Sequence, residues 1–129
     1  MSALAPFRNE PVLELRRASE REALFSPLTE LDAAGPVQAP VWIGAERREG
    51  HALVSHSPAE PERVVALAAI AGEDEVDAAL HAAQAGARAW RGAPAAERAA
   101  VLVAAAAWMR ERRRSLAALE VRECAKPWL

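Results

Sequence analysis

Residues 73–90 read EDEVDAALHAAQAGARAW, and they open a helical run that continues to Cys124. The apolar side chains of this stretch recur at steps of three and four residues, which places them on one face of an α-helix. They are Val76, Leu80, Ala83, Ala87 and Trp90. Acidic residues crowd the first turn, where the positive end of the helix dipole favours carboxylates. The sequence therefore predicts an amphipathic helix over 73–90, around which the rest of the chain is organised.

Two more helices are expected downstream, because Gly92 and Pro94 interrupt the first. The second should span 95–113 and the third 115–124, before Pro127 forbids continuation. We expect large apolar side chains of these helices to be mostly buried between them, so that Leu102→Ala costs about 2–5 kcal/mol. The predicted core residues are Val76, Leu80, Trp90, Leu102, Met109, Leu116 and Leu119.

The first part of the chain, residues 1–36, is expected to be a helical amino-terminal arm that ends at Gly35-Pro36. Asn9 and Pro11 are typical of the start of a short helix. Ser19 and Glu22 have the spacing of a capping box, so a second helix is predicted from about 20 to 31, bent or broken at Pro27.

Short strands are predicted near 41–44, 52–56 and 63–70, where β-branched residues gather between polar turns. The first two should pair as a hairpin, and the strands should form an antiparallel pair or a small sheet at one side of the helices. The fold class is therefore α/β, with three α-helices beside a few short strands over residues 37–129.

Composition limits the kinds of partner and compartment. The chain has 129 residues, 52% of them hydrophobic, and a net charge of −2, so no overall charge favours nucleic acid or an anionic membrane. No apolar run approaches the ~20 residues of a membrane span. The single cysteine excludes an intramolecular disulfide framework and favours the reducing cytoplasm.

Cys124 is the one candidate nucleophile, and we expect an ordinary thiol. No histidine lies near it in the sequence, Glu120 and Glu123 oppose formation of a thiolate, and a helix carboxyl end does so too. The three histidines, at 51, 56 and 81, share no metal-ligand spacing. The residues alone therefore assign no catalytic and no metal site.

The arginine cluster at 110–114 is the one candidate anion site. Arginines at a helix carboxyl end are more often a solvated terminus that matches the dipole, and no aromatic stacking platform accompanies them. The scattered glycines form no phosphate-binding loop. The residues alone assign no cofactor-binding site.

Several phrases, taken in order, resemble the start of the aldehyde dehydrogenase superfamily. They are Phe7-Arg8-Asn9-Glu10-Pro11, Trp42-Ile43-Gly44, Ser57-Pro58-Ala59, Glu75-Val76-Asp77, Glu97-Arg98-Ala99 and Lys126-Pro127-Trp128. The first and last of these phrases are most similar to the 1-pyrroline-5-carboxylate dehydrogenase branch. The resemblance covers nearly the whole chain, and it depends on the order of the motifs because each one alone is weak.

The resemblance implies a helix-rich amino-terminal fragment of a longer NAD-dependent oxidoreductase of proline catabolism, which converts L-glutamate γ-semialdehyde to glutamate. The family's catalytic cysteine, glutamate and asparagine, and most of its NAD site, would lie downstream, so no catalytic, cofactor-binding or metal residue is carried over. The chain is then expected to be inactive alone, with an incomplete NAD-binding domain over 37–129. Its partners would be the missing carboxyl-terminal part or another copy; the alternative is a non-enzymatic helical interaction module.

Four positions depart from the pattern of the family. Alanine stands at 125 and 45 where glycine is usual, Ser57 where asparagine is usual, and Ala87 where phenylalanine is usual. A left-handed conformation at Ala125 would cost about 1 kcal/mol more than at glycine. These departures suit either a truncated, relaxed copy or a divergent member of the family.

Overall fold

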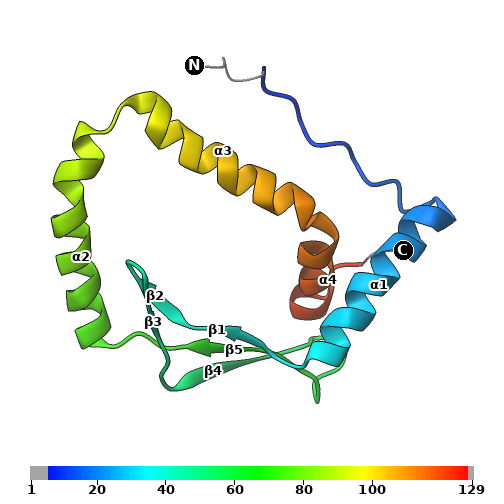
Figure 1. Ribbon diagram of the computed structural model, residues 1–129. Coiled ribbons are helices and arrows are strands. Elements are labelled where there is room, and N and C mark those ends of the chain that lie inside the picture. The colour runs from blue at the N-terminus through cyan, green and yellow to red at the C-terminus, as the bar shows by residue number, and fades with distance from the viewer. Residues whose placement is uncertain (1–5, 128–129) are drawn as a thin grey trace.

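The structure is a computed structural model that describes residues 6–127. In this part of the chain, helices and strands follow one another around an open frame, with the strands along one side (Figure 1). In chain order they are α1 (Ala18–Ala34), β1 (Val37–Ala39), β2 (Val41–Ile43), β3 (Glu46–Arg48), β4 (Ala52–His56), β5 (Val64–Ala69), α2 (Glu73–Gly92), α3 (Ala95–Glu111) and α4 (Arg113–Cys124).

The three helices predicted after residue 73 are present with nearly the predicted bounds, which confirms a helix-rich α/β fold. α2 begins at an acidic first turn, as the dipole argument requires. α4 ends at Ala125, whose φ of 50° lies in the left-handed region. The alanine found here in place of the usual glycine therefore does adopt the conformation that costs about 1 kcal/mol relative to glycine.

The amino-terminal arm differs from the prediction in two ways. The short helix expected at Asn9 is absent, because residues 6–14 have no regular structure, and a helix of a few residues is unstable without packing. The capping box at Ser19 is not formed either, since α1 starts earlier, with Arg17 as its N-cap. In its place Arg21 donates hydrogen bonds from Nη1 to the carbonyl oxygens of Leu15 and Arg16, each at 2.8 Å.

α1 runs through Pro27 without a break and ends at Gly35, whose φ is 76°. A proline removes one backbone donor and crowds the preceding turn, so it destabilises an isolated helix. Here tertiary packing holds the helix, because Leu24 and Leu28, on either side of the proline, are both buried. The break or bend expected at Pro27 therefore does not interrupt α1, and the helix, predicted to end near residue 31, continues to Ala34, directly before Gly35-Pro36.

The strands form two separate sheets. In the first sheet β5 is central, parallel to β1 and antiparallel to β4, so that Val54 lies opposite Leu67. In the second, β2 pairs with β3 and places Trp42 opposite Arg47. The predicted hairpin between 41–44 and 52–56 is therefore wrong. The turn after Ile43 is tight because Gly44 has a φ of 61°, so the chain reverses at once and the polar residues 46–48 become a strand.

The core is located differently from the prediction. Its central cluster joins α1 to α4 through Leu24, Leu28 and Ala118, with four partly buried side chains around it: Leu15, Leu31, Ala117 and Val121. The predicted core residues of α2 and α3 are exposed, from 54% at Val76 and Trp90 to 74% at Leu102. Only Leu116 and Leu119, on α4, are half-buried. The predicted helical period was right, but the residues that the structure describes leave these large apolar side chains of α2 and α3 more than half exposed.

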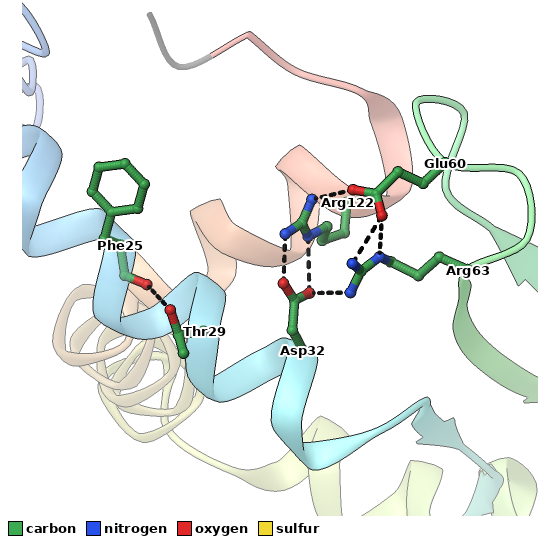
Figure 2. Close-up of polar contacts among 6 residues, drawn as sticks. All are labelled: Phe25, Thr29, Asp32, Glu60, Arg63 and Arg122. Atoms are coloured by element: carbon green, nitrogen blue, oxygen red, sulfur yellow. Dashed lines mark hydrogen bonds and ion pairs between the residues drawn. The ribbon is translucent and has the colours of Figure 1, made fainter.

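A network of charged side chains closes the frame where α1, α4 and the loop before β5 meet (Figure 2). Asp32 of α1 accepts from Nε of Arg122 at 2.9 Å and pairs with Nη1 of Arg63 at 2.7 Å. Glu60 accepts from Arg122 at 3.1 Å and from Nη2 of Arg63 at 2.8 Å. The hydrogen bond to Glu60 raises the pKa of Arg63. Two carboxylates are thus shared between two arginines from distant parts of the chain.

The loop that carries Glu60 also contains Ser57, one of the positions that depart from the family. Its backbone amide donates to the carbonyl of Arg63 at 3.0 Å, and its side chain is almost fully buried. The hydroxyl oxygen has no hydrogen-bond partner among the described residues. A buried hydroxyl without a partner destabilises a fold, so this serine contributes less to the loop than a well-bonded polar side chain would.

We expect Leu28→Ala to lower the free energy of unfolding by about 2–5 kcal/mol, because it leaves a cavity in the α1–α4 core. Leu102→Ala, at an exposed position, should change it by less than about 0.5 kcal/mol. Urea denaturation followed by circular dichroism measures both. Equal costs for the two variants would contradict the location of the core.

The charged network predicts a second difference in stability. Asp32→Ala removes the carboxylate shared by two arginines and should move the midpoint of urea unfolding to lower urea. Glu14→Ala, which removes only an exposed pair with Arg17, is the matched control and should have little effect. The loss in Asp32→Ala should shrink in 1 M NaCl, where screening is strong. Equal shifts for both variants would show that the network does not hold the frame together.

Candidate functional site

Cys124 is the last residue of α4, and its side chain is exposed. The neighbouring Glu123 is engaged with Ser55 of β4, whose hydroxyl donates to Oε1 at 3.3 Å. His56 contacts the carbonyl oxygen of Pro61 through Nδ1 at 2.8 Å. Among residues 6–127, no group of three His, Cys, Asp or Glu side chains is arranged to hold a metal ion. The described residues therefore gather no metal ligand set at the thiol, and the carboxylate next to it in the sequence is bonded to Ser55.

The arginine cluster at 110–114 is largely engaged with carboxylates. Arg110 pairs with Glu10 of the arm, Arg114 with Glu20 of α1, and Arg112 with the adjacent Glu111. The guanidinium of Arg112 also lies over the ring of Trp108, 4.4 Å from its centroid. The pair of Arg110 joins the arm to the end of α3, and the pair of Arg114 joins α1 to the start of α4, so the geometry supports a structural use of the cluster more than an anion site.

Gly72, between β5 and α2, is where a strand-to-helix junction could meet a phosphate. The backbone amide of Gly72 instead donates to Oε2 of Glu75 at 2.9 Å, and Glu73 and Asp74 add negative charge in the same turn. An anion would have to displace one carboxylate and approach two more. The described residues therefore do not fit the pyrophosphate of NAD at this junction.

A groove of about 490 Å³ lies between the arm, the end of α3 and the start of α4. Apolar side chains such as Met109 and Leu116 contribute to its lining, and charged residues of both signs complete it. The residues are Glu10, Ala106, Met109, Arg110, Arg113, Leu116, Ala117 and Glu120. Since the two arginines balance the two glutamates, the groove has no net charge that would favour an anion or a cation.

The two long helices carry many exposed apolar side chains, here called the α2–α3 surface. It consists of Val76, Leu80 and Trp90 on α2 with Val101, Leu102, Val103, Trp108 and Met109 on α3, all 46–74% exposed. Exposed apolar surface gathered in this way is typical of an interface with another polypeptide. Within residues 6–127 no helix is long and apolar enough to cross a membrane.

The sequence prediction included five of the eight side chains of the α2–α3 surface and assigned them to the core. They are Val76, Leu80, Trp90, Leu102 and Met109. The prediction missed the network of Asp32, Glu60, Arg63 and Arg122, because no spacing pattern links residues that are 90 positions apart. One signal for the surface was available in α3. No charged residue occurs between Ala99 and Met109, and a helix that is apolar all round must be covered on more than one side.

Comparison with known proteins places the chain in a family. The model of the aldehyde dehydrogenase family matches residues 42–129. The 1-pyrroline-5-carboxylate dehydrogenase 2 of Bacillus subtilis is 35% identical over 124 residues, which make up 95% of this chain and 24% of the relative. The 1-pyrroline-5-carboxylate dehydrogenase of Bacillus pumilus is 32% identical over the same share of each chain.

Solved structures agree with the sequence relatives. The 1-pyrroline-5-carboxylate dehydrogenase from Thermus with bound NAD has a TM-score of 0.92 at 35% identity, covering 98% of this chain and 25% of that one. The chain thus spans about a quarter of the length of the relatives that it matches. Of the closing motif Lys126-Pro127-Trp128, Trp128 lies outside the described residues. The chain belongs to the aldehyde dehydrogenase family, and within it most resembles the amino-terminal part of the 1-pyrroline-5-carboxylate dehydrogenases.

Proposed function

We propose that these 129 residues act as the amino-terminal scaffold of an NAD-dependent dehydrogenase that oxidises L-glutamate γ-semialdehyde to glutamate. The observation that carries the proposal is the match of almost the whole chain, in sequence and in fold, to 1-pyrroline-5-carboxylate dehydrogenases. A cytoplasmic location, expected from the single cysteine, is part of the same proposal.

On this proposal the chain does not catalyse the reaction alone. Oxidation of an aldehyde by the family's covalent route needs an activated thiol, a base and donors for the developing oxyanion. Cys124 is an exposed thiol at the carboxyl end of α4, where the helix dipole disfavours a thiolate, and the junction at Gly72 is occupied by Glu75. NAD and the reacting groups would be held by the remaining three-quarters of the protein, for which residues 37–129 supply an incomplete domain.

The α2–α3 surface would be where those remaining residues dock. α2 offers an apolar stripe whose members, such as Leu80 and Trp90, are more than half exposed. At roughly 25 cal/mol per Å² of apolar area removed from water, covering several such side chains stabilises an association by several kcal/mol. Residues 1–36 would support this surface from behind, because α1 packs against α4, the helix that follows α3.

A second candidate function rests on the same surface. If the chain acts without a dehydrogenase partner, the exposed helices would make it a non-enzymatic interaction module that binds another protein or itself. The enzymatic scaffold is favoured because it also accounts for the resemblance outside α2 and α3. Activity measurements separate the two candidates.

We predict that the purified chain, given NAD and glutamate semialdehyde, produces no NADH above the blank. A version of the Bacillus subtilis relative that lacks its matched 124 residues should also be inactive alone. Co-expression of the two should restore NADH production, because the docked scaffold completes the fold. Turnover by the chain alone would contradict the proposal, and so would a failure of co-expression to restore any activity.

A pair of variants locates the docking surface. Leu80→Glu puts a charge into the apolar stripe of α2 and should reduce the restored activity at least about tenfold, which corresponds to ~1.4 kcal/mol of docking energy. His81→Glu, the adjacent position on the polar face, is the matched control and should leave the restored activity unchanged. Loss of activity in both variants, or in neither, would exclude the apolar stripe as the docking site.

A further inference from the structure

The groove between the arm, the end of α3 and the start of α4 contains two unpaired charges of opposite sign. Four charged side chains line it, and two of them, Arg110 and Glu10, are paired with each other. The other two are Arg113 and Glu120. Neither forms an ion pair with any of residues 6–127. One cation and one carboxylate of the groove are therefore available to a ligand.

The two unpaired charges lie at opposite ends of an apolar wall. Arg113 and Glu120 are seven positions apart on α4, which is nearly two helical turns, so they share a face and are separated by about 10 Å along the axis. Leu116 and Ala117 lie between them on the same face, and both are half-buried. Figure 1 shows α4 turning away from the end of α3, so this face of α4 and α3 together border the groove.

The helix itself favours a carboxylate at one end of this wall. Arg113 is the first residue of α4 and is half-buried, so its guanidinium lies at the positive end of the helix dipole. A ligand carboxylate beside Arg113 is attracted by the guanidinium and by the dipole. Beside Glu120, a ligand carboxylate is repelled and a cation is attracted. The groove therefore orients a ligand that has one charge of each sign.

The spacing of the charges limits the size of the ligand. The groove volume of about 490 Å³ lies within the range of ~300–1,000 Å³ that is usual for small-molecule sites. A free amino acid, glutamate included, is too short to reach both ends, because only a few bonds separate its charges. An extended peptide of three residues spans about 10 Å and has an ammonium group and a carboxylate at its two ends.

We propose that this groove binds a short peptide, about three apolar residues long, through both of its free termini. The peptide carboxylate pairs with the guanidinium of Arg113, and such a charge-assisted pair can form two parallel hydrogen bonds. The peptide ammonium pairs with Glu120, and its apolar side chains contact Leu116 and its neighbours. This binding site goes beyond the function proposed above and does not rest on it.

The peptide site is separate from the α2–α3 surface. Met109 is the one member of that surface that also lines the groove. Arg113, Leu116 and Glu120 belong to α4, which contributes no residue to the α2–α3 surface. Substitutions on α4 therefore test the peptide site without removing a side chain from the surface assigned to the remaining dehydrogenase.

Isothermal titration calorimetry of the purified chain with trileucine, whose termini are both free, tests the site. The wild-type chain should bind trileucine with a Kd of about 1 mM or below. Arg113→Gln removes a half-buried charge and should raise the Kd at least about tenfold, as for a strong charge-assisted pair. Glu120→Gln removes an exposed charge and should raise it about threefold. Glu111→Gln, an exposed carboxylate outside the groove, is the matched control and should leave the Kd unchanged.

Blocked peptides show which charge meets which residue. N-acetyl-trileucine lacks the ammonium group, so it should bind the wild-type chain about threefold more weakly and lose nothing further in Glu120→Gln. Trileucine amide lacks the carboxylate, so its binding should be weaker by at least about tenfold and should be unaffected by Arg113→Gln. Each result follows because removing either partner abolishes the same contact.

Urea midpoints check that each variant is folded, and the blocked peptides carry the test on the wild-type chain if a variant is not. Failure of the wild-type chain to bind trileucine, equal binding of free and blocked peptides, additive losses in the blocked pairs, or an equal loss in Glu111→Gln would each overturn the proposal. Restored dehydrogenase activity is measured separately, so either proposal can fail while the other holds.

Discussion

The contact between α1 and α4 is the interaction on which the rest of the structure depends. Leu24 and Leu28 pack against Ala118, a residue with no exposed surface, and this contact joins a helix near the beginning of the chain to the last one. Because α1 leads into the strands and α4 follows α3, the contact closes the frame seen in Figure 1. The network of Asp32, Glu60, Arg63 and Arg122 reinforces the same corner (Figure 2).

This arrangement holds two helices away from any core of their own. α2 has polar side chains along one side and an apolar stripe along the other, while α3 has almost no polar side. Both would be unsuitable surfaces for an isolated globular protein, because apolar area left in water is unfavourable and promotes association. The chain spans about a quarter of the length of the relatives that it matches. Such surfaces are therefore where further polypeptide would be expected to pack.

Many charged side chains of the described residues are engaged with one another. Arg110 and Arg114 are paired with carboxylates of the arm and of α1, and the backbone amide of Gly72 before α2 donates to Glu75. Polar groups here serve to hold elements in place. The charged side chains of this chain mainly join its own elements, and many of its large apolar side chains are exposed. Both features are consistent with a function that depends on a larger assembly.

The sequence by itself determined the helices after residue 73 and the family of the chain, because these follow from local periodicity, from chain-breaking residues and from ordered motifs. Only the tertiary structure decided where the core lies. Periodicity shows that Leu80 and Trp90 share a face of α2, but it cannot show whether anything covers that face. The pairing of Asp32 with Arg122, and of β2 with β3 rather than β4, depended likewise on how the chain turns in space. Contacts between distant residues leave no spacing in the sequence from which they could be deduced.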